Sequence, residues 1–199
     1  MTLPQGRSRS RLMLNRGAPL SYTTSSRRPD LRRPRRGVTL PDIGMLVVFL
    51  LIAAAVAGFG SIVTIDQVDG WYASATHVTW TPPNWAFGAV WTVLYLLIAV
   101  SGWLLWLRRA RGPLILYVAQ LVVNAVWTPV FFGAYPIIGR PALWIAVAII
   151  VLLDLLVVAT IATAWPVSRR AAALLLPYLA WILYASTLNW GDAVLMSLA

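Results

Sequence analysis

Cysteine, lysine and glutamate are all missing from this chain of 199 residues, and histidine occurs only once. The absence of cysteine excludes disulfides, zinc–thiolate sites and iron–sulfur clusters. With a single His and six Asp as the remaining common ligands, no metal site built from several carboxylates or histidines is expected. Charged residues make up only 11 % of the chain, against about 25 % in a soluble domain. We therefore expect an integral membrane protein without a bound metal.

Hydrophobic residues make up 60 % of the chain, and eleven residues are tryptophan. They gather in five long segments, each near the roughly 20 residues that a helix needs to cross the hydrocarbon core. Lipid offers no partner for free backbone groups, and these unbroken runs lack the alternation of a membrane β-barrel. We predict an all-α integral membrane protein, a five-transmembrane-helix bundle, with helices at approximately residues 43–64, 84–107, 114–132, 142–164 and 171–190.

Residues 1–41 differ from the rest of the chain in composition. Ten of the sixteen arginines lie between Arg7 and Arg36, among serines and prolines and without a long hydrophobic run. This predicts a disordered tail, followed by a membrane domain over residues 42–199. Tyr22 is the tail's only aromatic residue, so no nucleic-acid partner is expected. The tail is interpreted either as a cytoplasmic segment that touches anionic lipid head groups or as an organellar transit peptide.

The other arginines predict the orientation of the chain in the membrane. The connections after the second and fourth segments hold Arg108, Arg109, Arg111, Arg169 and Arg170. Together with the tail they place fifteen of sixteen arginines on one side, and Arg140 alone on the other. The positive-inside rule then predicts a cytoplasmic N-terminus and an external C-terminus. We expect a multi-pass protein of a bacterial cell membrane, with an organellar membrane as the alternative.

Polar and aromatic side chains share one face of the third segment. Gln120, Asn124, Trp127 and Phe131 are spaced four, three and four residues apart, which places them one above another on a helix. Two amides inside a membrane are costly unless they find partners. They are interpreted either as interhelical hydrogen bonds, worth about 0.6–2 kcal/mol each, or as the polar part of an aromatic-lined cavity.

Two ionisable residues have open interpretations. Asp154 falls near the centre of the fourth segment, where an ionisable group suggests a function; the alternative is a protonated or hydrogen-bonded structural aspartate. His77 lies in the long connection between the first two segments, about residues 65–83. It is expected to be solvated, and the alternative is contact with the metal of a metalloporphyrin or with a ligand carboxylate.

Conventional catalytic motifs are absent from the sequence. A Ser–His–Asp triad would have to use the single histidine, no G-x-S-x-G turn exists, and no glycine-rich phosphate loop occurs. Paired carboxylates at membrane depth are missing too. A conventional hydrolase or transferase is therefore not expected.

Aromatic residues in a fixed order carry a more specific signal. The pair Trp71-Tyr72 is followed by Trp80-Thr81-Pro82-Pro83-Asn84-Trp85-Ala86-Phe87-Gly88-Ala89-Val90-Trp91. The third and fifth segments add Gln120, Asn124, Trp127, Pro129 and Phe131, then Pro177, Tyr178, Trp181, Ala185 and Asn189. Over about residues 43–190 this combination resembles the TspO/MBR family, the tryptophan-rich sensory proteins and translocator proteins, also called peripheral-type benzodiazepine receptors.

The resemblance implies a five-helix bundle, often a homodimer, that binds porphyrins and hydrophobic drugs beside the loop between the first two helices. No cofactor is required, because protoporphyrin or heme is itself the ligand, and membrane lipid is a further partner. The family usually has a Lys-Pro pair where this chain has His77-Val78, a departure that bears on the conformation of that loop. Carried over by position, the ligand-binding residues are Trp71, Tyr72, Trp91, Tyr95, Asn124, Trp127, Trp181 and Ala185.

Some members of the family also degrade protoporphyrin in light, and the resemblance implies Trp91 and Trp181 as the catalytic residues of that reaction. The favoured hypothesis is a membrane receptor or carrier for tetrapyrroles and related hydrophobic ligands, including a regulatory sensor. The alternatives are a light-dependent porphyrin-degrading enzyme and a structural or interaction protein. Stacking and burial alone explain the deep aromatic residues, which favours the receptor.

Overall fold

The computed structural model describes residues 37–198, and within that range every regular element is a helix. Five helical stretches are long and apolar enough to cross a membrane, which confirms the predicted fold class. The first span begins at Leu40 and ends at Val68, so it is longer at both ends than predicted. Apart from the start of that helix, the predictions for the N-terminal tail lie outside the described residues.

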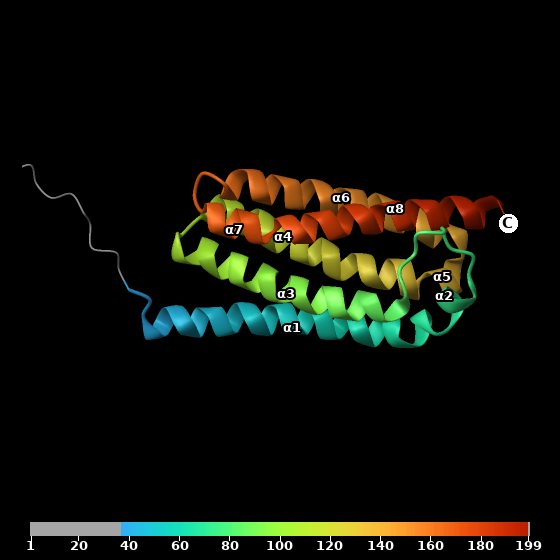
Figure 1. Cartoon of the computed structure of the whole chain (residues 1–199), viewed down its shortest axis with the longest axis horizontal. Helices are drawn as coiled ribbons and strands as arrows, with labels where there is room; N and C mark the ends of the chain where they lie inside the picture. The colour runs from blue at the N-terminus through green and yellow to red at the C-terminus, as the bar shows by residue number, and fades with distance from the viewer. Residues whose placement is uncertain (1–36, 199) are drawn as a thin grey trace, which may run out of the picture. The chain divides into compact units, whose positions relative to one another are not determined.

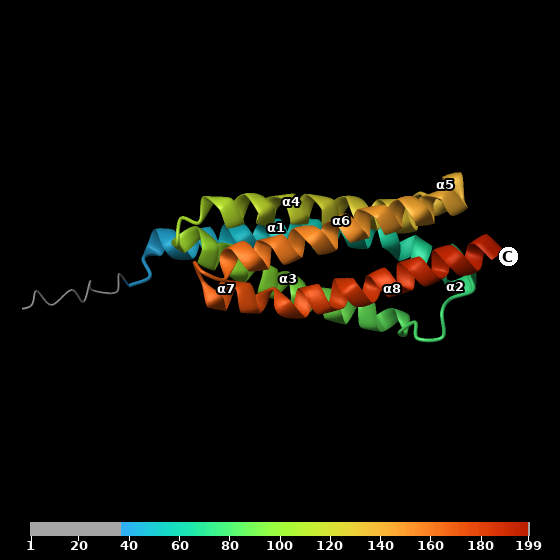
Figure 2. The same cartoon turned by 90° about the horizontal axis from the view of Figure 1, so that it is seen from above.

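The elements follow one another as spans and short connecting helices: α1 (Leu40–Val68), α2 (Trp71–Ser74), α3 (Asn84–Leu107), α4 (Arg111–Thr128), η1 (Pro129–Gly133), α5 (Tyr135–Ile138), α6 (Arg140–Ala164), α7 (Arg169–Leu174) and α8 (Leu176–Leu198). The π-helix η1 completes the third span, and α7 with α8 makes the fifth. The long helices lie side by side, with α2, α5 and the C-terminal end of α8 at one end of the bundle and α7 at the other (Figures 1 and 2).

Local sequence signals explain where the spans begin. The Thr39 N–H and hydroxyl both donate to Asp42 Oδ2, at 2.8 and 2.7 Å, just before the first turn of α1. Pro41, Pro113 and Pro141 each lie in the first turn of a span. A missing N–H is no loss there, because the first N–H groups of a helix have no intrahelical partner.

Proline also interrupts two of the spans. Pro129 has no N–H to give, and the chain widens into η1, where the Ala134 N–H donates to the Pro129 carbonyl at 2.9 Å. Pro177 similarly separates α7 from α8 near Leu175. The change at Pro129 turns both Phe131 and Phe132 toward the interior, where they are buried.

The inside of the bundle is tightly packed and its outside is apolar. A Cβ at Gly102 of α3 would lie 2.5 Å from Tyr117 Cζ and 2.8 Å from Phe49 Cδ1, so glycine is what lets these helices approach. Large apolar side chains point outward along the long helices, among them Leu51, Val93, Val122, Leu155 and Leu183. Such a surface is suited to lipid and marks a multi-pass membrane protein.

Candidate functional site

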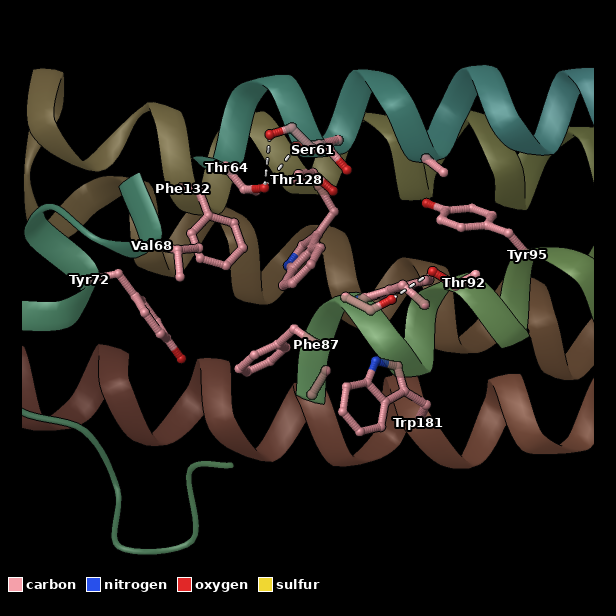
Figure 3. A pocket seen from close by; sticks show the side chains of 16 residues that line it. Ser61, Thr64, Val68, Tyr72, Phe87, Thr92, Tyr95, Thr128, Phe132 and Trp181 are labelled. Carbon is pink, nitrogen blue, oxygen red and sulfur yellow. Dashed lines mark hydrogen bonds between the residues drawn. The ribbon is translucent and has the colours of Figure 1, made fainter. Parts of the chain in front are cut away.

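An internal cavity of about 160 Å³ lies toward the end of the bundle that holds α2. Its walls come from α1, α3, the α4–η1 span and α8, and α2 contributes Tyr72 (Figure 3). The lining residues are Ala57, Gly60, Ser61, Thr64, Val68, Tyr72, Phe87, Gly88, Trp91, Thr92, Tyr95, Trp127, Thr128, Phe132, Trp181 and Ala185.

Aromatic rings form most of the wall opposite α1. Trp91 stacks on Tyr95 with ring centroids 5.3 Å apart, and Trp181 meets Phe87 edge-on at 6.0 Å. Tyr72 and Tyr95 lie at opposite ends of the lining, with Phe87 between them (Figure 3). Rings presented in this way bind flat, apolar molecules through stacking and burial.

The wall from α1 consists of small and hydroxyl residues, and sequence reasoning missed it. Ala57, Gly60, Ser61, Thr64 and Val68 lie on one face of α1 and line the cavity. The Thr64 hydroxyl donates to the Gly60 carbonyl at 3.0 Å, so it is partnered within its own helix. Small residues three or four apart inside a bulky segment are the signal that could have found this wall.

Neighbouring residues of α2 have different positions. Tyr72 is buried and lines the cavity, its ring 5.3 Å from that of Phe132. Burial, with a further contribution from Asp192, raises the pKa of Tyr72 well above its ordinary value, so its phenol is neutral. Trp71 instead stacks on Tyr135 at 4.1 Å and donates from Nε1 to the Phe132 carbonyl at 2.9 Å. It anchors α2 and does not line the cavity.

Asn124, predicted to contact the ligand, lies behind the cavity wall. It is buried between Tyr95 and Tyr178, accepting from the Tyr95 hydroxyl at 2.9 Å and donating to the Tyr178 oxygen at 3.1 Å. Both ends of its amide are therefore occupied, and it is absent from the lining. The structure gives Asn124 the role of an interhelical hydrogen-bonding residue that fixes Tyr95.

Six of the eight predicted residues gather around this one cavity: Tyr72, Trp91, Tyr95, Trp127, Trp181 and Ala185. The pair implicated in degradation, Trp91 and Trp181, is among them. Phe87 and Phe132 line it as well, and the sequence did not single them out, because aromatic residues near helix ends are also typical of membrane interfaces. That any of these residues binds a ligand stays a prediction.

The expectation that His77 is solvated is wrong. Its Nδ1 lies 3.0 Å from Asp192 Oδ2 and its Nε2 lies 2.6 Å from the Tyr72 carbonyl oxygen, with 16 % of the side chain exposed. The reason is that the chain between α1 and α3, residues 69–83, folds back onto α8. We call this segment the α1–α3 loop.

Asp154 lies outside the cavity lining. The Ser186 hydroxyl of α8 donates to Asp154 Oδ2 of α6 at 2.8 Å, so the carboxyl group joins two packed helices. This contact fits the structural interpretation of Asp154. Within residues 37–198, no group of three or more His, Cys, Asp or Glu side chains is placed to hold a metal ion.

Five membrane-spanning helices around an aromatic-walled cavity define a multi-pass membrane protein with an internal apolar site. The chain belongs to the TspO/MBR family, whose sequence model matches residues 47–194.

Relatives with established names come from all three domains of life. The chain is 37 % identical over 156 residues to the tryptophan-rich protein TspO of Archaeoglobus fulgidus, covering 75 % of this chain and 95 % of that protein. It is 39 % identical over 131 residues to the translocator protein of Homo sapiens, covering 60 % and 71 %. The tryptophan-rich sensory protein of Cereibacter sphaeroides is 33 % identical over 150 residues, covering 75 % and 89 %. These relatives support a membrane receptor or sensor role in the family.

Proposed function

We propose that this protein is a membrane receptor or carrier that binds tetrapyrroles such as protoporphyrin and heme, and related flat hydrophobic ligands, in the internal cavity. The observation that carries the proposal is the gathering of Tyr72, Trp91, Tyr95, Trp127 and Trp181 from four elements around one space. Stacking on such rings needs no resident cofactor, and a sensor would use the same site.

The cavity must widen to hold such a ligand. Its volume of about 160 Å³ is below the roughly 300–1,000 Å³ of pockets that hold drug-sized molecules. Tyr72 of the α1–α3 loop and the side chains of Phe87 and Trp181 belong to the lining, and their displacement would widen the cavity without unfolding a span. Binding and release are therefore expected to depend on motion of the loop.

One hydrogen-bond donor in the wall has no partner. Trp181 Nε1 is buried and makes no hydrogen bond within the described part of the chain. A buried N–H without a partner is costly, and a ligand acceptor such as a carboxylate would satisfy it. This donor without a partner, together with the hydroxyl groups of the wall, supports a ligand with a few polar groups at the edge of a flat ring.

A dark titration of the full-length protein in lipid nanodiscs with protoporphyrin tests the proposal. We expect saturable quenching of tryptophan fluorescence, with affinity reduced in Trp91→Ala by loss of the stacking ring. Trp85→Ala is the matched control, because Trp85 is 75 % exposed and lies outside the cavity. Absence of saturable binding, or equal loss in both variants, would favour the structural or interaction hypothesis.

Light-dependent degradation of porphyrin is the second candidate, favoured by one observation: Trp91 and Trp181 line the same cavity. Two oxidisable indoles beside a bound photosensitiser could relay electrons toward oxygen. If so, Trp91→Phe should retain most of the binding while loss of the porphyrin spectrum under illumination slows sharply. If wild-type protein in light and air gives no product beyond that of free porphyrin, the degradation hypothesis fails and only the receptor hypothesis remains.

We also propose that the N-terminus is cytoplasmic and the C-terminus lies on the other side of a bacterial cell membrane. The arginine distribution supports this orientation, and the odd number of spans separates the two ends. Reporter fusions at each terminus test it. A C-terminal reporter that is active only in the cytoplasm would reverse the assignment.

A further inference from the structure

The α1–α3 loop is fastened to α8 at one titratable pair. His77 Nδ1 lies 3.0 Å from Asp192 Oδ2, and the Val78 N–H donates to Asp192 Oδ1 at 3.4 Å. The Asp192 side chain is completely buried, although it is a carboxyl group inside an apolar bundle. A buried carboxyl group that contacts two successive loop residues attaches the loop to α8. Breaking these contacts would leave the buried carboxyl group without partners, which is costly.

The geometry requires a proton between His77 and Asp192. The Tyr72 carbonyl oxygen, 2.6 Å from His77 Nε2, only accepts, so Nε2 must carry a hydrogen. Nδ1 and the carboxylate can then bond only if one further proton lies between them, whichever group carries it. When that proton leaves, the neutral ring has one N–H for two acceptors, so a lone pair faces either the carboxylate at 3.0 Å or the Tyr72 carbonyl at 2.6 Å, and one attraction is replaced by repulsion.

The pair is connected directly to the cavity. The His77 ring lies 4.1 Å, centroid to centroid, from the ring of Tyr72, which lines the cavity. On the other side, Val78 packs against Gly191 so closely that a Cβ there would collide with the Val78 side chain. The loop thus lies directly on the α8 backbone at the point where His77 and Asp192 meet.

We infer that His77 and Asp192 are positioning residues that form a proton-dependent latch, which holds the α1–α3 loop over the cavity and controls ligand release. The inference rests on the proposed function, since it concerns the same cavity. The latch is complete at low pH and is lost when rising pH removes the proton that the two side chains share. The loop therefore opens, and ligand leaves faster, at the higher pH.

Among the described residues, two phenols lie near the latch. Burial raises the pKa of Tyr72 above its ordinary value, so that phenol stays neutral, and Tyr184 contributes to this rise. Tyr184 fixes the loop separately, donating to the Trp80 carbonyl at 2.7 Å. Asp66 and Asp69, at the end of α1, form no hydrogen bond or ion pair with His77 within the described residues.

The rate at which protoporphyrin leaves the full-length protein in nanodiscs, measured in the dark from pH 5.5 to 8.5, tests the latch. Wild-type release should become roughly tenfold to hundredfold faster over this range, as expected when a charge-assisted hydrogen bond is lost. Asp192→Ala and His77→Phe should release quickly at both ends of the range. The phenylalanine keeps the ring beside Tyr72, so fast release would be due to the lost hydrogen bonds.

His77→Lys is the matched control, because lysine keeps a cationic donor throughout this range. This variant should release protoporphyrin slowly at every pH. Any remaining dependence of the release rate on pH is then due to ionisation of the ligand itself. A wild-type profile that is flat, or parallel to that of His77→Lys, would overturn the latch while leaving binding intact.

A readout without ligand separates the latch from the proposed function. Hydrogen exchange at the amides of residues 72–80, taken as the ratio of wild type to His77→Phe at each pH, should show protection at pH 5.5 that disappears by pH 8.5. The chain has one histidine, so nitrogen-15 histidine labelling follows its two ring nitrogens directly. Protection that changes with pH in a protein that binds no porphyrin would reject the proposed function and keep the latch; constant protection would reject the latch.

Discussion

Ala185→Leu is expected to weaken porphyrin binding strongly while the bundle stays folded. Ala185 is a buried residue of α8 whose methyl group lines the cavity. Leucine adds three carbon atoms to a space of about 160 Å³, where a flat ring would otherwise lie. We expect the affinity to fall on the order of 100-fold, about 2.7 kcal/mol, because the ligand can no longer enter without displacing a packed side chain.

The control for this substitution is the same chemical change on the outside of the bundle. Ala148 of α6 is exposed and lies outside the cavity, so Ala148→Leu should leave protoporphyrin affinity unchanged. Thermal unfolding of both variants in detergent would show that each is folded, and cavity filling should leave the stability of Ala185→Leu unchanged or slightly raised. Wild-type affinity in Ala185→Leu would mean that the ligand binds elsewhere.

The fold was largely predictable because the membrane restricts the choices of the chain. Long apolar runs must be helical when lipid offers their backbone no hydrogen-bond partner. This rule correctly predicted all five spans of the described residues. The observed limits of α3, Asn84–Leu107, agree with the predicted ones because Pro83 precedes the helix and Arg108 follows it. The end of α1 was placed too early because Asp66 interrupts the apolar run, whereas the helix continues to Val68.

The cavity was less predictable because sequence spacing identifies the face of a helix but not what the face contacts. Gln120, Asn124, Trp127 and Phe131 are all buried, as their common face predicted. Only Trp127 of these four lines the cavity, because the amide of Asn124 is held by two tyrosines from other helices. Such a partner choice depends on side chains far apart in the sequence.

The latch illustrates the same limit more strongly. His77 and Asp192 are 115 residues apart, and neither lies in a recognisable motif. A lone histidine in a loop is ordinarily solvated, and only the return of the α1–α3 loop onto α8 makes it a partner of a buried carboxyl group. The small residues of α1 were not predicted for a different reason. They line the cavity without any aromatic side chain, and the prediction of the site relied on aromatic residues.

Asn124→Ala is expected to destabilise the bundle more than it weakens ligand binding. The amide joins the Tyr95 hydroxyl of α3 to the Tyr178 hydroxyl of α8, at 2.9 and 3.1 Å. Alanine removes both hydrogen bonds, leaves two buried phenols without these partners and opens a small void. We expect the free energy of unfolding to fall by about 2–4 kcal/mol, measured by denaturant unfolding of the purified protein in mixed micelles.

Tyr95→Phe separates the effect of Asn124→Ala on stability from its effect on ligand affinity. It removes one hydrogen bond of the amide and keeps the aromatic ring in the cavity wall. It should cost about 1 kcal/mol of stability, with little change in protoporphyrin affinity. For Asn124→Ala itself we expect the affinity to fall by only about threefold, under 1 kcal/mol, because Asn124 lies behind Tyr95 and does not touch the cavity. The reverse pattern, a loss of affinity beyond tenfold with stability unchanged, would mean that the ligand reaches past Tyr95 to the amide. The wall would then open between Tyr95 and Tyr178 on binding, and Asn124 would contact the ligand after all.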